Sequence, residues 1–338
     1  MTVVATPAAA SRTAEPEPPR RRTVRFLSLS NVSLLFIWAI LIVTFGLLAP
    51  DTFLTVDTFR TVLAGQAITA IMALALLMPI AAAQFDLSIA GSMGMGIVLV
   101  ATFMSKLETG VATAMGLTLI VGVAIGLINA FIVVRLKVNS FIATLGTGSV
   151  LVAGIQWVTG GQQIVAGIPT TFTDLGRHEV FTIPLSVVYM FLIAGVMWYV
   201  LELRQTGRYL YAIGSNKEAA RLAGVRVDRL TTIALVVSAV IATIAGIVFV
   251  MRIGSASLDA GTPYLLPAFA AAFLGATQFR QGNVNVLGTL VAVYVLATGV
   301  KGVQLIGAPF WVDDLFNGVA LIIAVALAVR SGQQKALV

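Results

Sequence analysis

Long apolar runs alternate with short polar segments along almost the whole chain. The runs predict ten membrane-crossing helices, near residues 31–50, 62–83, 89–105, 111–134, 140–159, 183–201, 230–251, 266–277, 285–304 and 314–329. A helix needs about 20 apolar residues to cross a hydrocarbon layer about 30 Å thick, and most of the runs provide them. Proline, glycine and threonine at 160–182 and 252–265 predict outer loops or re-entrant pieces. The pattern therefore predicts an all-α integral membrane protein.

Composition supports lipid as the solvent for most of the chain. Of 338 residues, 59% are hydrophobic and only 10% are charged, so a single soluble core would leave a large apolar surface exposed. Cysteine is absent and His178 is the single histidine, which excludes disulfides, thiol metal sites and clusters of histidine ligands. We therefore predict no metal site.

Positive charge is unevenly distributed over the predicted topology. A net charge of +7 would suggest nucleic-acid binding in a soluble protein, but in a membrane protein its placement reports orientation. With the N-terminus in the cytosol, sixteen of the 21 lysines and arginines fall on the inner side. The outer five are Arg60, Lys106, Arg177, Arg252 and Lys301. This bias predicts that both termini are cytosolic and gives no reason to expect a nucleic-acid partner.

The chain divides into two parts of different composition. Residues 1–25 combine five arginines with Pro, Ala, Glu and Thr, which predicts a disordered basic tail in the cytosol. Residues 26–338 form the predicted transmembrane domain, whose longest inner connection is the loop at 202–229.

This inner loop is predicted to contain a helix of its own. Ser215 and Glu218 form an S-x-x-E capping box, and Gly224 readily adopts the left-handed conformation that ends a helix. The side chains between them provide one smooth apolar face: Ala219, Ala220, Leu222 and Ala223. The pattern predicts a two-turn helix parallel to the membrane.

A helix of two turns needs a partner, because helix nucleation is unfavourable and so short a helix adds few hydrogen bonds to compensate. Small side chains would allow it to dock closely in a groove of another protein and to transmit movement. The alternative is an interfacial helix that its arginines attract to anionic membrane lipid.

Three segments resemble the same protein family. Residues 206–225, TGRYLYAIGSNKEAARLAGV, closely resemble the cytosolic coupling segment of the ribose-type, or monosaccharide, ABC transporter permeases. Residues 85–92, FDLSIAGS, resemble the glycine-rich Asp-Leu-Ser block of these permeases, and residues 138–147, VNSFIATLGT, resemble their Thr-Leu-Gly block. The three segments occur in the expected order, and the resemblance covers about residues 30–330.

The resemblance implies a division of labour between subunits. It implies a permease in the bacterial inner membrane that pairs with a second copy or a paralogue, binds cytosolic ATPase subunits through coupling helices, and receives sugar from an extracytoplasmic binding protein. The chain would then be no enzyme and bind no cofactor, with ATP and Mg²⁺ used by the partner ATPase. No Gly-Lys pair occurs in it, so it has no Walker A loop. The residues expected to serve ATPase coupling are Gly207, Arg208, Gly214, Ser215, Asn216, Glu218, Ala219, Ala220, Arg221 and Gly224.

Polar residues in or beside the predicted spans are candidates for the solute pathway, because polar groups at bilayer depth are costly unless they are paired or wetted. The candidates are Asp86, Ser88, Asn129, Asn139, Thr144, Thr147, Gln156 and Asn317. Structural roles are the alternative. The Asp86 carboxylate can cap the start of the third helix. The threonines and Gln156 can form hydrogen bonds between helices, worth about 0.6 kcal/mol each.

The alternative function is an ion-coupled secondary transporter of a small polar solute. It predicts ionisable residues buried in the middle of spans, whereas Asp86, Asp313 and Asp314 lie at predicted span boundaries. A membrane enzyme would need a set of nucleophile, base or metal ligands that we do not find in the sequence. A purely structural scaffold would leave the loop helix unexplained.

Overall fold

The structure, a computed structural model, describes residues 33–180, 183–279, 282–309 and 311–328. The predicted cytosolic tail at 1–25 lies outside them. Within the described residues nearly everything is helical, and the only strands there are β1 (Glu179–Val180) and β2 (Ile183–Pro184), an antiparallel pair of two residues each. The all-α prediction is therefore confirmed.

Helices form close to the predicted apolar runs, because a chain in lipid must satisfy its backbone hydrogen bonds internally. Those along the runs are α1 (Ser33–Leu48), α3 (Val56–Gly65), α4 (Ala67–Ala81), α5 (Ile89–Ser105), α6 (Val111–Ala130), α7 (Ser140–Thr159), α9 (Leu185–Trp198), α12 (Val227–Ile253), α13 (Leu265–Ala276), α14 (Val286–Leu305) and α15 (Val312–Ala328). Two π-helical turns extend α6 and α9, namely η2 (Phe131–Arg135) and η3 (Tyr199–Leu203). The short connecting helices are α2 (Pro50–Phe53), α8 (Thr170–Arg177), α10 (Gln205–Ser215), α11 (Lys217–Leu222) and the 3-10 turn η4 (Thr262–Tyr264).

Six helical segments of the described chain are long and apolar enough to cross a membrane: Val56–Ala81, Val111–Arg135, Ser140–Thr159, Leu185–Leu203, Val227–Ile253 and Val286–Leu305. Shorter apolar helices occupy Leu34–Leu48, Ile89–Ser105 and Thr262–Ala276. The chain is therefore a multi-pass membrane protein, while the full number of ten crossings stays a prediction.

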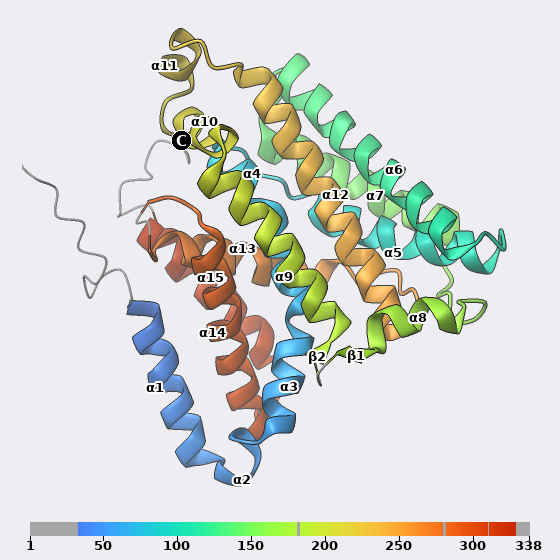
Figure 1. The fold of residues 1–338 in the computed structure, drawn as a ribbon, viewed down its shortest axis with the longest axis vertical. Helices are drawn as coiled ribbons and strands as arrows, with labels where there is room; N and C mark the ends of the chain where they lie inside the picture. Colours follow the sequence, from blue (N-terminus) through green and yellow to red (C-terminus); the bar gives the residue numbers. More distant parts are fainter. Residues whose placement is uncertain (1–32, 181–182, 280–281, 310, 329–338) are drawn as a thin grey trace, which may run out of the picture.

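The connections predicted to share the inner side lie together at one end of the bundle (Figure 1). There α10 and α11 project beside the C-terminal end of α4. The Tyr211 hydroxyl of α10 donates a hydrogen bond to the Val284 carbonyl between α13 and α14, over 2.8 Å. We call this the inner end of the molecule. α2, α8 and the strand pair lie at the opposite, outer end.

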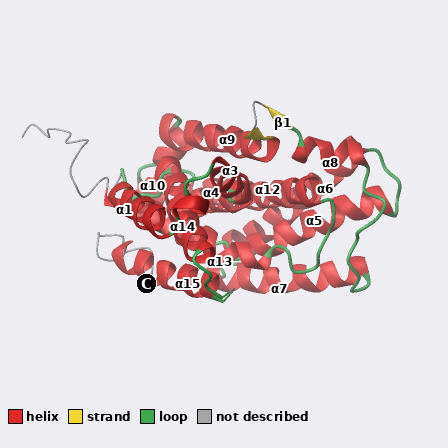
Figure 2. Ribbon diagram, turned by 90° about the horizontal axis from the view of Figure 1, so that it is seen from below, coloured by secondary structure: helices red, strands yellow, loops and turns green. Residues whose placement is uncertain are grey.

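The central helix of the bundle is α12, which packs along α4, α5 and α6. Figure 2 shows it between the layer of α9 and the layer of α7. Glycines bring the backbones close together: a methyl group on Gly126 of α6 would lie 2.5 Å from the Cα of Val236 in α12. Such close approach compensates for the lack of a hydrophobic driving force between helices in lipid.

Candidate coupling hairpin and solute groove

Two helices, not one, form the predicted inner loop at 202–229. α10 and α11 together make a hairpin at residues 205–225, which we call the coupling hairpin. The prediction of a single short helix in an otherwise open loop was wrong, and α12 also begins earlier than predicted, at Val227. α10 escaped prediction because its buried residues Gly207, Leu210 and Ile213 are too few to form an apolar run.

The N-terminal cap of α11 lies one residue beyond the predicted one. Asn216 is the capping residue, and its Oδ1 accepts a hydrogen bond from the backbone N–H of Ala219 at 2.9 Å. Ser215 is still the last residue of α10, and its hydroxyl donates to the Tyr211 carbonyl. The capping box of Ser215 and Glu218 was therefore wrong. Glu218 pairs with Arg221 instead, at 3.3 Å on the surface.

The C-terminal end of α11 matches the prediction. Gly224 adopts the left-handed conformation, with φ at 84°. Its N–H donates to the Arg221 carbonyl, and the N–H of Val225 donates to the Ala220 carbonyl, both over 3.0 Å. These two bonds form a Schellman motif, which satisfies carbonyls that a helix end otherwise leaves without partners.

Only part of the predicted apolar face of α11 is buried in the protein, and the rest is exposed. Ala220 is buried against the rest of the chain, whereas the Leu222 side chain is 89% exposed. Ala219 and Ala223 are exposed as well. The hairpin thus presents a small apolar surface beside Lys217 and Arg221, which suits either a partner protein or the membrane interface.

Two glycines allow α10 to pack closely against the transmembrane helices. Gly207 lies against the Leu201 carbonyl in η3, and Gly214 lies against the Ala81 carbonyl at the end of α4, with no room for a side chain at either position. Arg208, between these two glycines in the sequence, is exposed. The coupling hairpin is therefore packed directly onto the end of α4.

Removing the observed cap should weaken α11 more than removing the predicted one. Asn216→Ala loses the hydrogen bond to Ala219, a change that typically costs about 1 kcal/mol. If α11 binds the ATPase that the family resemblance implies, this binding should become several-fold weaker. Ser215→Ala loses only a bond within α10, so binding should change little. Titration of purified ATPase against each variant measures the difference. Equal binding by both variants would contradict the assigned cap.

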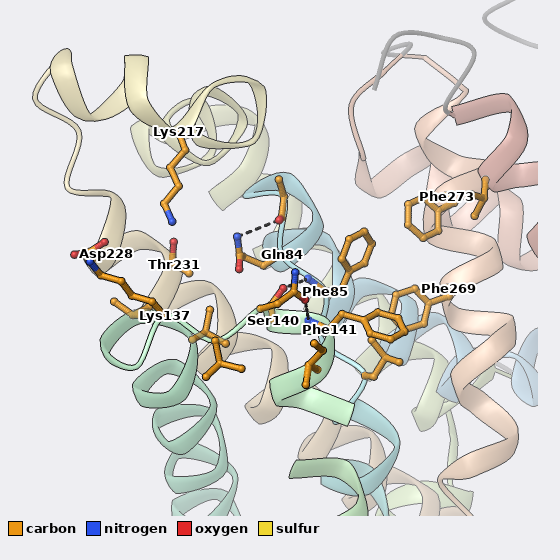
Figure 3. Close-up of a pocket in the computed structure, with 18 of the residues that line it drawn as sticks. Gln84, Phe85, Lys137, Ser140, Phe141, Lys217, Asp228, Thr231, Phe269 and Phe273 are labelled. Carbon is orange, nitrogen blue, oxygen red and sulfur yellow. Dashed lines mark hydrogen bonds between the residues drawn. The ribbon is translucent and has the colours of Figure 1, made fainter. Parts of the chain in front are cut away.

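Next to the hairpin, a groove of about 1300 Å³ opens at the inner end (Figure 3). Lys217 and Arg221 of α11 and Asp228 of α12 line its polar side. The loop between α4 and α5, residues 82–88, forms its middle. α13 and α15 line the far side. In Figure 3 Lys217 points from α11 towards Thr231 at the groove wall.

Three phenylalanines form an aromatic wall in this groove. The Phe85 and Phe273 ring centroids are 6.3 Å apart, and Phe273 stacks on Phe269 at 6.2 Å. Gln84 lies beside them, and its amide Nε2 donates to the Ala83 carbonyl at 3.0 Å. The wall thus combines flat apolar surfaces with an amide group. Neither Phe85, between two apolar runs, nor Phe269 and Phe273, within one, gave any indication of this role in the sequence.

α7 holds the 82–88 loop in place through its first two turns. The Phe85 N–H donates to the Ser140 hydroxyl at 3.0 Å, and the Leu87 N–H donates to the Thr144 hydroxyl at 2.9 Å. Thr144 in turn donates to the Ser140 carbonyl at 2.7 Å. Thr144 therefore positions the groove wall while its own side chain is buried.

The eight predicted pathway residues lie in four different environments. Asn139 lines the groove. Asn317 lines a second cavity, of about 470 Å³, between the outer parts of α3, α14 and α15. Thr147 donates to the Ala143 carbonyl, and Gln156 is exposed on α7. The remaining four are buried and lie away from the groove surface: Asp86, Ser88, Asn129 and Thr144. The structure therefore does not bring the eight together in one site.

Asp86 is fully buried, although the sequence places it at a span boundary. Its Oδ1 accepts hydrogen bonds from the Ser88 N–H at 3.1 Å and from the Ser88 hydroxyl at 2.6 Å. The Ser88 hydroxyl accepts one from Asn129 Nδ2 at 2.7 Å. The carboxylate thus binds the N–H of the residue before α5, rather than one within the first turn of the helix. The predicted role of Asp86 as the cap of this helix was therefore wrong, because the N-cap residue of α5 is Ser88 and no side chain caps its first turn.

Comparison with known proteins matches most of the chain. Residues 59–325 match the family described as the permease component of branched-chain amino acid transport systems. The autoinducer 2 import system permease protein LsrD of Yersinia enterocolitica serotype O:8 is 30% identical over 254 residues, which cover 73% of this chain and 76% of that protein. LsrD of Yersinia pseudotuberculosis serotype O:3 is 31% identical over 255 residues, with 73% and 76% covered. No solved structure matches. The family match includes the coupling hairpin and the groove loop.

Proposed function

Because the chain belongs to the family of permease components of branched-chain amino acid transport systems, we propose that it imports a monosaccharide or a related small polar solute, driven by ATP. Family membership makes it an inner-membrane transport subunit rather than an enzyme, and it confirms the resemblance to the ribose-type ABC permeases. ATP and Mg²⁺ are bound by a separate ATPase subunit in this proposal, and the chain itself binds no cofactor.

The main structural support for an ATP-driven mechanism is the contact of Gly214 with the Ala81 carbonyl, which links the coupling hairpin to the groove. Ala81 ends α4, and the groove-lining residues Gln84 and Phe85 follow within one turn of chain. A partner that moves α11 would move α10, and α10 cannot shift towards α4 without moving the groove loop. The ATPase therefore acts on the solute groove through the coupling hairpin.

The groove suits a small solute that has both apolar faces and polar edges. Binding sites for small molecules are lined mainly by apolar and aromatic groups, with a few polar groups that fix orientation. The aromatic groups here are Phe85, Phe269 and Phe273. The polar groups are Gln84 and Asn139. A sugar ring has the matching combination of C–H faces and hydroxyl edges. Autoinducer 2, named for the similar Yersinia permeases, is a second solute to test.

The proposed importer also includes a second permease subunit, membrane lipid and a solute-binding protein. Large apolar side chains are exposed along α7, among them Phe141, Ile142 and Leu145. In the proposed importer, a second copy of the chain or a paralogue covers part of this surface, and membrane lipid covers the rest. An extracytoplasmic binding protein delivers the solute to the outer end. The N- and C-termini lie in the cytosol.

Reconstitution in proteoliposomes tests the function. The chain is purified with the ATPase and binding protein that accompany it, and uptake of radiolabelled D-ribose, autoinducer 2 and L-leucine is measured with and without ATP. We expect ATP-dependent uptake of a sugar-like solute only when the ATPase is present. Uptake by the chain alone, driven by a sodium or proton gradient, would establish the alternative of an ion-coupled secondary transporter.

Loss of the central ring of the aromatic wall should weaken solute handling. Phe273→Leu keeps an apolar side chain but removes the flat ring between Phe85 and Phe269 that the solute would contact. Loss of one such aromatic contact, about 1 kcal/mol, should raise the KM for uptake about five-fold. Phe59→Leu, at an exposed position on α3, is the matched control. Measured uptake kinetics with an unchanged KM in Phe273→Leu would remove the aromatic wall from the pathway.

A further inference from the structure

The groove at the inner end is larger than a small solute requires. Its volume is about 1300 Å³, whereas pockets for drug-sized ligands measure roughly 300–1000 Å³. In Figure 3 the lysines Lys137 and Lys217 lie on the side of the groove away from Phe269 and Phe273. A sugar ring on the aromatic wall would therefore leave the side with the two lysines empty. A second ligand could occupy this side.

The charges that line the groove do not balance. Its lining contains three cations and two carboxylates, namely Lys137, Lys217, Arg221, Glu218 and Asp228. Arg221 pairs with both carboxylates, at 3.3 Å from Glu218 and 3.5 Å from Asp228. Neither lysine takes part in an ion pair within the described residues. The groove thus has a net charge of +1 and two lysines that can bind an anion.

Lys137 stands at a backbone position that favours glycine. It lies in the turn between η2 and α7, and its φ is 56°, in the left-handed region. Glycine adopts this conformation without strain, whereas a residue with a Cβ is uncommon there. Strained residues of this kind cluster at functional sites. Together with its place in the groove lining, the strain suggests that the lysine serves a ligand rather than the fold.

The groove is open to the membrane as well as to the cytosol. Three of the large apolar side chains that line it are exposed, Phe141 and Ile142 on α7 and Leu266 on α13. Val133 and Val134 of η2 also line it, close in sequence to Lys137. A lipid could therefore enter from the inner leaflet, with apolar surface for its acyl chains and lysines for its head group. Basic pockets between transmembrane helices on the cytoplasmic side bind anionic head groups in this way.

We propose that an anionic phospholipid of the inner leaflet binds in this groove, with its phosphate between Lys137 and Lys217 and its acyl chains on the apolar residues of η2 and α7. A phosphodiester carries one negative charge, which matches the net charge of the groove. A phosphate monoester carries about −1.5 to −2 at pH 7 and would exceed it. Lysine has a long, flexible stem, so the two ammonium groups can converge on one phosphate.

The proposed lipid joins two parts of the permease. Lys217 begins α11 of the coupling hairpin, whereas Lys137 belongs to the turn between η2 and α7. A phosphate held by both lysines would therefore link the hairpin to the transmembrane helices across the groove. The site does not depend on which solute is transported.

Native mass spectrometry of the purified full chain tests lipid binding. The chain is released from micelles that contain equal amounts of phosphatidylglycerol and phosphatidylcholine, and we expect it to retain phosphatidylglycerol preferentially. Lys137→Met and Lys217→Met should each weaken this binding about five-fold. Arg135→Met is the matched control, because Arg135 is exposed, close to Lys137 and outside the groove lining. Equal retention of the two lipids, or an equal loss in Arg135→Met, would overturn the proposal.

Lys137→Gly separates a ligand-binding role from a structural one. Glycine removes the cation and also relieves the strain of the left-handed conformation. Binding of phosphatidylglycerol should therefore weaken as much as in Lys137→Met, while the Tm of the chain does not fall. A lower Tm with unchanged lipid binding would show that the lysine serves the fold, and would contradict the proposal.

Further measurements distinguish the lipid from other occupants. Phosphatidylglycerol with a photoactivatable acyl chain should cross-link to η2 or to the first turns of α7 in membranes. Displacement of the bound lipid by millimolar inorganic phosphate would show a site for free phosphate instead. A disulfide between two copies of Ile142→Cys in the membrane would assign this surface to the second permease subunit. Either result would overturn the lipid site and leave the proposed transport function intact.

Discussion

Gly214→Val should reduce ATP-dependent uptake at least about ten-fold while the chain still inserts in the membrane. The side chain would overlap the Ala81 carbonyl, so α10 must move away from the end of α4. Overpacking of this kind costs about 1–3 kcal/mol, and about 1.4 kcal/mol corresponds to a factor of ten. The loss should appear in uptake more than in ATPase binding, because the exposed face of α11 is unchanged.

Gly195→Val is the matched control for this variant. Gly195 lies in α9, and a side chain added there would meet no atom within 4 Å. Both variants are compared for yield, Tm, ATPase binding and uptake in the same proteoliposomes. Normal uptake by Gly214→Val would mean that the hairpin and the groove are not mechanically joined. Loss of uptake in both variants would indicate a general sensitivity of the bundle to β-branched residues.

Gly224→Val should uncouple ATP hydrolysis from uptake. Gly224 has φ at 84°, where a residue with a Cβ is strained by roughly 1–2 kcal/mol. Space is not the obstacle, because no atom lies within 4 Å of an added Cβ. α11 has only six residues, so it cannot absorb the strain without losing its last turn. We expect ATPase activity in the complex to continue while uptake per ATP falls several-fold.

The variant Gly224→Asn distinguishes the effect of backbone strain from the effect of adding a side chain. It tolerates the left-handed conformation better than other residues with a Cβ, so Gly224→Asn should retain most of the coupling. Uptake per ATP hydrolysed is measured for both variants in the reconstituted complex. The explanation based on backbone strain fails if the valine and asparagine variants are impaired to the same degree.

The sequence could predict those features that lipid or local geometry imposes. Apolar runs correspond to helices because a backbone in lipid must hydrogen-bond within itself, and α5 and α7 begin and end at their predicted residues. The left-handed conformation of Gly224 was also predictable, because glycine directly after a short helical pattern commonly ends a helix.

Features that depend on tertiary contacts were not predictable from the sequence. α10 is stabilised by the packing of Gly207 and Gly214 on the carbonyls of Leu201 and Ala81, and neither glycine belongs to an apolar run of the sequence. Because α10 extends to Ser215, the cap of α11 moves to Asn216. The extra helix thus explains the error in the capping box.

The burial of Asp86 shows the same limit at the level of a single side chain. A boundary position in the sequence suggested access to water, but residues from α6 and α12 cover the carboxylate in the structure. The aromatic wall was missed for a related reason, because Phe85 and Phe273 meet only when the 82–88 loop packs against α13.

The most direct test of the account is the side of the membrane on which α11 lies. The chain contains no cysteine, so Glu218→Cys introduces a single thiol at an exposed position. Gln162→Cys provides the control at the outer end. With a membrane-impermeant maleimide, Glu218→Cys should be labelled in inverted vesicles only and protected when the ATPase binds. Gln162→Cys should be labelled in intact spheroplasts. Labelling of Glu218→Cys in intact spheroplasts would contradict a cytosolic coupling hairpin.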